Sequence, residues 1–121
     1  MRIRSSRTST GPLRTTDFLV LAVLADGPQH GYALAQAIAD RSRRRATVRP
    51  GDLYRVLYRM SRAGLIDTAD APRGRDDESG RRTYYRITPA GRRVAREEAS
   101  YLREVCASLL GRRAAKPERS S

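Results

Sequence analysis

The segment from Gly51 to Ala63 alternates apolar and charged side chains with the period of a helix. At 100° per residue its apolar side chains gather within about a third of the circumference. These side chains are Leu53, Val56, Leu57 and Met60. The opposite side and its edge carry Asp52, Tyr54, Arg55, Tyr58, Arg59 and Arg62. We therefore predict a helix that packs its apolar back on a core and presents arginines and tyrosines outside.

The size and charge of the chain limit what this helix can belong to. The 121 residues, 39% of them hydrophobic, have room for one domain with a single modest core. With 25 basic and 13 acidic residues, the formal net charge is +12, which attracts polyanions such as nucleic acid or an anionic membrane surface. Lys116 is the only lysine, so the charge is arginine, which grips a phosphate or a guanine edge with two bonds. A genome rich in G and C would also favour arginine codons.

The positive charge is concentrated around the predicted helix. Residues 41–62 contain eight arginines, Arg49 among them, against the single carboxylate of Asp52. Residues 16–40 contain three aspartates and no lysine or arginine. A solvated charged face alone would not require this clustering, whereas a nucleic-acid-binding element does. The exposed side of the 51–63 helix is therefore predicted to lie in the major groove of DNA, with arginines on guanine or phosphate and tyrosine hydroxyls on phosphate.

Two more helices are predicted before it. The apolar run 18–25 could be a strand or a buried helix; its leucines and alanines, and a cap at Thr16 before Asp17, favour a helix. A second helix is expected from about Gly31 to Arg41. Residues 46–48 are long enough for one bridge of β-structure.

Two strands, 65–69 and 82–87, follow the third helix, and a loop of residues 71–81 joins them. Gly64 is expected to end the third helix in a left-handed conformation. Thr88 caps a last helix that begins at Pro89 and ends at Gly111. The loop carries Arg73, Arg75 and Arg81, which could touch phosphates or enter the minor groove, although three acidic residues at 76–78 oppose this.

The fold class expected from this order is mainly α with a small β-hairpin: a winged helix-turn-helix plus a C-terminal dimerisation helix. Residues 1–15 would form a flexible basic arm, 16–88 the winged helix-turn-helix, 89–111 the dimerisation helix and 112–121 a disordered basic tail. The last helix has an apolar stripe that either covers the domain's own core or forms a dimer interface, and its length favours the interface. The stripe consists of Val94, Tyr101, Leu102, Val105 and Leu109.

Other classes of function find little support in the sequence. There is no glycine-rich phosphate loop, pair of catalytic carboxylates or nucleophile motif, so we do not expect an enzyme. His30 and Cys106 are the only residues of their types, so neither a metal nor a cofactor is expected, and Cys106 is either a packing residue or a redox sensor. No apolar run approaches the ~20 residues that span a bilayer, and we expect a cytoplasmic, nucleoid-associated protein.

Four runs resemble the PadR family of transcriptional regulators in order and spacing. They are GPQHGYAL at 27–34, PGDLY at 50–54, GLI at 64–66 and RTYYRITPAG at 82–91, within a match over about residues 16–93. The resemblance implies a winged helix-turn-helix that dimerises through its C-terminal helix and represses by operator binding, relieved in some members by a small molecule. It also implies that Tyr32 and Tyr54 contact DNA phosphate.

Three residues depart from the family pattern. Asp52 stands where a hydroxyl residue is usual, and Arg55 replaces a frequent proline. Arg49 replaces a hydroxyl cap, so the helix start at Pro50 lacks that side-chain acceptor. These departures predict that the operator sequence differs from the operators of relatives that match the family pattern better.

Two hypotheses follow. The first is a sequence-specific repressor that reads a pseudo-palindrome as a homodimer, its reading helices about 34 Å apart. The alternative is a nonspecific basic winged-helix module that binds RNA, DNA or a protein partner through general attraction of charge.

Overall fold

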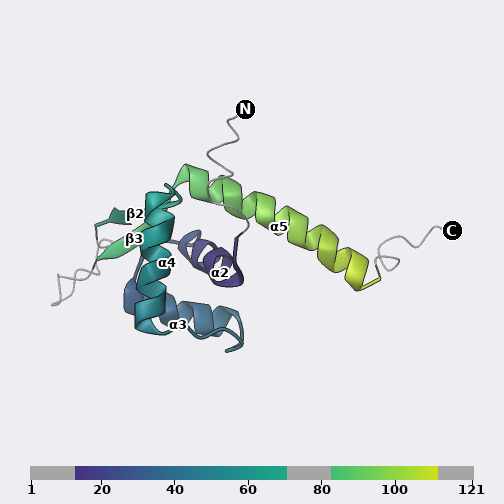
Figure 1. Ribbon diagram of the computed structural model, residues 1–121, viewed down its shortest axis with the longest axis horizontal. Helices are drawn as coiled ribbons and strands as arrows, with labels where there is room; N and C mark the ends of the chain where they lie inside the picture. Colours follow the sequence, from purple (N-terminus) through teal and green to yellow (C-terminus); the bar gives the residue numbers. More distant parts are fainter. Residues whose placement is uncertain (1–12, 71–82, 112–121) are drawn as a thin grey trace.

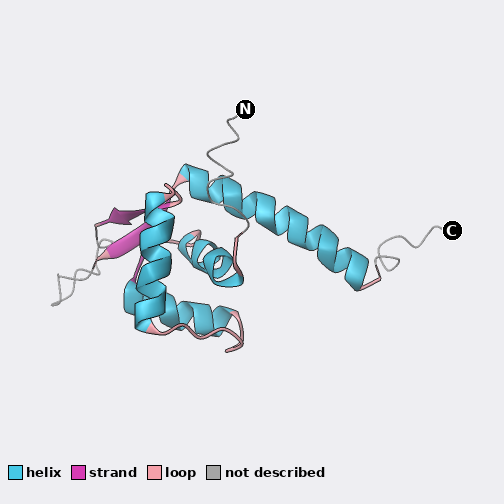
Figure 2. Cartoon of the chain, viewed as in Figure 1, coloured by secondary structure: helices cyan, strands magenta, loops and turns pink. Residues whose placement is uncertain are grey.

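The computed structural model describes residues 13–70 and 83–111. Its helices and strands follow the predicted order of two helices, a third helix, a hairpin and a long last helix (Figure 1). They are α2 (Thr15–Leu24), β1 (Gln29–His30), α3 (Gly31–Arg41), α4 (Pro50–Arg62), β2 (Ile66–Ala69), β3 (Tyr84–Ile87) and α5 (Pro89–Leu109). The mainly helical class with a small sheet, and with it the winged helix-turn-helix, is confirmed (Figure 2). The predicted wing loop 71–81, most of the arm 1–15 and the tail 112–121 lie outside the described residues.

The core is built around α2, which packs against α3, α4 and α5. Because α2 is apolar on nearly every side, it is buried between the other helices, and the choice of helix over strand for residues 18–25 is confirmed. The largest fully buried side chains all come from α2, α3 and α4. They are Val20, Leu21, Leu24, Leu34, Ile38, Leu53, Leu57 and Met60.

The start of α2 differs from the prediction. A cap at Thr16 is wrong, because the helix already begins at Thr15 with Arg14 as its N-cap residue. The carboxylate of Asp17 reaches back and accepts a hydrogen bond from the Arg14 backbone N–H at 3.3 Å. The acidic residue in the first turn thus does the capping that was assigned to the threonine hydroxyl.

The small sheet has the order β1-β3-β2, with both pairs antiparallel. The predicted bridge at residues 46–48 is wrong, and the third strand is β1, in which His30 lies opposite Tyr84. Residues 46–48 pair with no strand. Instead, the Ala46 backbone N–H donates to the Ser42 hydroxyl at 3.0 Å, and Ala46 and Val48 pack on the core. In β1, His30 also caps α3 by accepting from the Ala33 backbone N–H at 3.3 Å.

Thr88 joins the end of α4 to the start of α5. Its hydroxyl donates to the Gly64 carbonyl at 2.7 Å and accepts from the Gly91 backbone N–H at 3.0 Å. Gly64 has a φ of +79°, which confirms the left-handed end predicted for the third helix. Gly91 lies so close to this junction that a Cβ there would be 2.1 Å from the Leu65 carbonyl oxygen. The beginning of α5 is therefore fixed to the domain, while its C-terminal half projects away from it (Figure 1).

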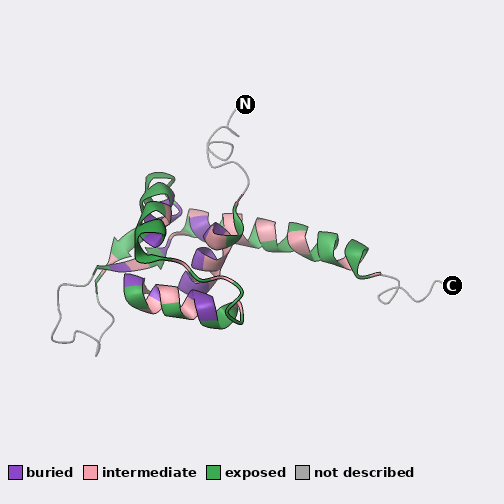
Figure 3. Cartoon of the chain, turned by 60° about the horizontal axis from the view of Figure 1, so that its bottom comes forward, coloured by how far each residue is buried: buried purple, intermediate pink, exposed green. Residues whose placement is uncertain are grey.

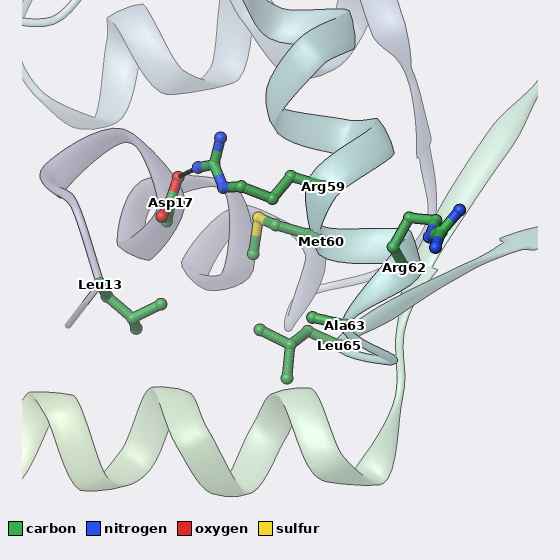
Figure 4. Close-up of a pocket in the computed structure, with 7 residues that line it drawn as sticks. All are labelled: Leu13, Asp17, Arg59, Met60, Arg62, Ala63 and Leu65. Atoms are coloured by element: carbon green, nitrogen blue, oxygen red, sulfur yellow. Dashed lines mark hydrogen bonds and ion pairs between the residues drawn. The ribbon is translucent and has the colours of Figure 1, made fainter. Parts of the chain in front are cut away.

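A charged pair ties the first turn of α2 to the last turns of α4. Asp17 is only 5% exposed, and its second carboxylate oxygen lies 2.5 Å from the guanidinium Nη2 of Arg59 (Figure 4). The Arg59 side chain is itself about half-buried. A carboxylate this deeply buried needs such a partner, because an unpaired buried charge is costly.

We expect the change Arg59→Ala to lower the free energy of unfolding by about 1–3 kcal/mol, because Asp17 loses its charged hydrogen-bond partner. The control is Arg55→Ala on the same helix, which removes only an exposed ion pair with Asp52 and should change stability by less than about 0.5 kcal/mol. Urea unfolding measures both values. Equal losses from the two changes would contradict the stabilising role of the buried pair.

Candidate nucleic-acid interface

The helix α4 has a buried apolar side and an exposed polar side, as the sequence predicted. Leu53, Leu57 and Met60 are buried, and Val56 is half-buried against the same core. The rest of the helix surface is exposed (Figure 3). It comprises Pro50, Gly51, Asp52, Tyr54, Arg55, Tyr58, Arg59, Ser61 and Arg62. One helix therefore presents carboxylate, guanidinium and phenol groups from a rigid, anchored support.

Three tyrosines stand out on this side of the domain. Tyr58 is 66% exposed, Tyr54 is 54% exposed and Tyr32, in the first turn of α3, is 70% exposed. An aromatic side chain this exposed gains little from burial, so its presence suggests a contact with a partner. The Tyr32 hydroxyl accepts a hydrogen bond from the Gln36 amide at 3.4 Å, one turn along the same helix.

Two interactions organise the arginines of α4. Arg62 donates to the Tyr58 hydroxyl at 3.3 Å, and its guanidinium carbon lies 5.8 Å from the centre of the Tyr58 ring. Arg55 pairs with Asp52 at 2.9 Å, three residues before it on the helix. The two residues that depart from the family pattern on this face are thus partners of each other. Asp52 holds the Arg55 guanidinium along the helix and leaves it exposed.

Arg59 lies differently from its neighbours on α4. The helical wheel placed it with Arg55 and Arg62, but its guanidinium is engaged by Asp17 of α2. Arg49, at the N-cap position of α4, is exposed and makes no capping hydrogen bond. The structure therefore brings Arg55, Tyr58 and Arg62 together on one helix face. Arg73, Arg75 and Arg81 lie outside the described residues.

The sequence analysis missed Tyr85, which lies beside Tyr54. Burial raises the pKa of the Tyr85 phenol above its usual value, and the neighbouring Tyr54 phenol raises it further. Strand alternation could have found it, since the preceding Tyr84 faces the core and the next side chain must face the other way.

The turn between α3 and α4 adds positive charge. Arg43 and Arg44 have φ values of 58° and 65°, a region that residues other than glycine rarely adopt. Backbone hydrogen bonds hold this turn, including those from Arg43 N–H to the Asp40 carbonyl at 3.1 Å and from Arg45 N–H to the Ser42 carbonyl at 3.1 Å. All three arginine side chains of residues 43–45 are exposed.

A pocket of about 310 Å³ lies where the start of α2 meets the end of α4 (Figure 4). The pocket is lined by Leu13, Asp17, Arg59, Met60, Arg62, Ala63 and Leu65. The Asp17–Arg59 pair forms part of its wall, and the pocket lies at the C-terminal end of α4. In residues 13–70 and 83–111, no three His, Cys, Asp or Glu side chains are grouped so that they could hold a metal ion.

The apolar stripe of α5 divides into two parts. Val94 packs against the domain's own core, whereas Leu102 is half-buried and the remaining members are exposed. Tyr101 is 62% exposed and Leu109 81% exposed. Val105 and Cys106 are exposed in the same stretch. Within the described part of the chain, α5 and the other helices are too short or too polar to cross a membrane.

A family model described as the transcriptional regulator PadR-like family matches residues 20–97. A transcriptional regulator of Mycobacterium tuberculosis is 35% identical over 92 residues, which cover 76% of this chain and 79% of that protein. A PadR family transcriptional regulator from Eggerthella lenta, known from a crystal structure, is 29% identical with a TM-score of 0.59; the match covers 78% of this chain and 80% of that chain.

A third relative is much longer than this chain. An uncharacterized 37.1 kDa protein of a Streptomyces fradiae transposon is 40% identical over 89 residues, which make up 72% of this chain. The match covers only 23% of that protein's length.

Proposed function

The chain belongs to the PadR-like family of transcriptional regulators, and on that premise we propose that it is a repressor that binds a pseudo-palindromic operator as a homodimer. The observation that carries the proposal is the exposed face of α4, where Arg55, Tyr58 and Arg62 stand opposite the apolar side that packs on the core. A helix fixed in this way can enter a major groove at a set depth. The exposed arginines supply the donors that recognise guanine.

The side chains of this face have different roles in the proposal. Arg55, held along the helix by Asp52, reads base edges, and the Asp52 carboxylate is able to accept from a cytosine amino group. Tyr58 and Arg62 contact phosphate or base as a pair. Tyr32 and Tyr54 contact phosphate and fix the register, with the wing arginines and Arg49 as further contacts.

The homodimer is proposed from the exposed half of α5. Tyr101, Val105 and Leu109 expose apolar surface on a helix that projects beyond its own domain. Pairing with a second copy would cover this surface and place two reading helices about 34 Å apart, one turn of DNA. A small-molecule effector, where one exists, would release DNA by changing that separation. Such a repressor would act at the nucleoid in the cytoplasm.

The alternative is a module that binds nucleic acid without sequence preference. It is favoured by the net charge of +12 and by the exposed arginines at 43–45, which attract any polyanion. The two functions respond differently to salt. A repressor keeps its preference for one duplex as salt rises, whereas a nonspecific module loses all duplexes together.

Selection of the protein against a random duplex library at ~150 mM salt tests the repressor directly. We expect an enriched inverted repeat. In the Arg55→Ala variant, the preference for the selected duplex over an unrelated one should fall by about 10–100-fold, the value of one lost base contact. The matched control is Arg103→Ala, which removes the same charge from an exposed position on α5 and should keep the preference. A folded protein that binds DNA but enriches no sequence would support the nonspecific module instead.

Dissociation of the dimer is tested by placing a charge on the apolar stripe. The change Val105→Asp or Leu109→Asp puts a carboxylate in the proposed interface, and sedimentation should show the mass fall from two chains to one. The control is Ser100→Asp, which adds the same charge to an exposed position on the opposite side of α5 and should leave the dimer intact. A single-chain mass for the unchanged protein at micromolar concentration would contradict the proposed assembly.

A further inference from the structure

Gly31, the first residue of α3, is buried beneath the Tyr54 side chain of α4. A Cβ at residue 31 would lie 2.9 Å from the Tyr54 hydroxyl oxygen, 3.3 Å from its Cζ and 3.6 Å from its Cε1. Carbon atoms do not approach a neighbour this closely without displacing it. The Tyr54 hydroxyl therefore occupies the space that a side chain at residue 31 would need.

Backbone conformation does not account for glycine at this position. Gly27 and Gly64 have φ values of +151° and +79°, which side chains rarely tolerate, whereas Gly31 is not among the residues with positive φ. The contrast with Gly51, in the first turn of α4, is equally clear, because a Cβ there would meet nothing within 4 Å. Residue 31 must therefore be glycine because a side chain there would take the space that the Tyr54 side chain occupies.

The Tyr54 side chain lies at a position suited to an anion. The first turn of a helix carries partial positive charge on its backbone N–H groups, and α3 begins at Gly31, with the Ala33 N–H of this turn already bonded to the His30 imidazole. The adjacent Tyr32 is exposed at the same helix end. Tyr85 of β3, opposite Gln29 in the sheet, lies near enough to Tyr54 for the Tyr54 phenol to raise its pKa. The Tyr54 hydroxyl thus lies against the first turn of α3.

We propose that Gly31 is a positioning residue for DNA recognition: its missing side chain lets the Tyr54 hydroxyl lie against the first turn of α3, from where it donates to a backbone phosphate. The inference rests on the proposed DNA-binding function and adds a residue that itself touches no DNA.

A methyl group at residue 31 would act mainly on Tyr54. The Tyr54 ring is about half-exposed, so it can swing outward into solvent while Leu53 and the rest of the core stay in place. The domain would remain folded, but the hydroxyl would leave the first turn of α3. A loss of DNA affinity without a loss of stability distinguishes positioning from a purely structural role.

The test measures Kd for the selected duplex and the urea unfolding midpoint for Gly31→Ala, Tyr54→Phe and the double variant. We expect each single change to weaken binding by about tenfold, since each removes the same charge-assisted hydrogen bond. The double variant should bind no more weakly than either single variant, because the contact can be lost only once. All three should keep the unfolding midpoint of the unchanged protein.

The matched control for stability is Gly51→Ala, the same substitution at a helix start where a Cβ has open space, and it should keep the unfolding midpoint of the unchanged protein. The control for affinity is Ser100→Ala at an exposed position on α5, away from the α4 face, and it should keep the Kd of the unchanged protein. The inference is overturned if Gly31→Ala binds as tightly as the unchanged protein, if the two losses add, or if Gly31→Ala lowers the unfolding midpoint in proportion to its affinity. In each of these cases the selected duplex still exists and the repressor proposal stands. If no duplex is selected, the repressor proposal fails and the positioning role fails with it.

Discussion

The burial of Leu53, Leu57 and Met60 is the constraint on which the rest of the arrangement depends. The domain has one small core, and these three side chains enter it from a single helix face. With 3.6 residues per turn, burying that face leaves α4 only one orientation about its axis. Arg55, Tyr58 and the other polar residues must then stand outside. The exposed polar face of α4 is thus a consequence of core packing, and the core beneath it fixes its backbone.

A second contact sets how α4 lies against α2. The pair between Asp17 and Arg59 joins residues 42 positions apart, and it engages one of the arginines that the helical wheel assigns to the exposed face. A wheel reports only the direction of a side chain from its own axis. It cannot show that a buried carboxylate of another helix lies in that direction. The helical wheel places Arg55 and Arg59 on the same face. That Arg59 pairs with a buried carboxylate of α2, and Arg55 with an exposed one on its own helix, is therefore a property of the folded domain.

The features that were predictable from sequence are those with local causes. The bounds of α3, the left-handed Gly64 and the Thr88 cap of α5 each follow from residues within one turn, and the structure has all three. The strand β1 was missed because two residues carry no period, and it exists only through its pairing with β3. At the site, Tyr54 was predictable from the family pattern. The space that Gly31 leaves for it required the packing of α3 against α4.

Hydroxyl-radical footprinting of the protein on its selected duplex tests the central claim most directly, because it reports where backbone is covered on both strands. The account predicts two equally protected segments related by a dyad, their centres about one helical turn apart on the same face of the duplex. Such a pattern requires two copies of the exposed α4 face, held by paired α5 helices. Uniform protection along the duplex, or one protected segment without a symmetric copy, would contradict it.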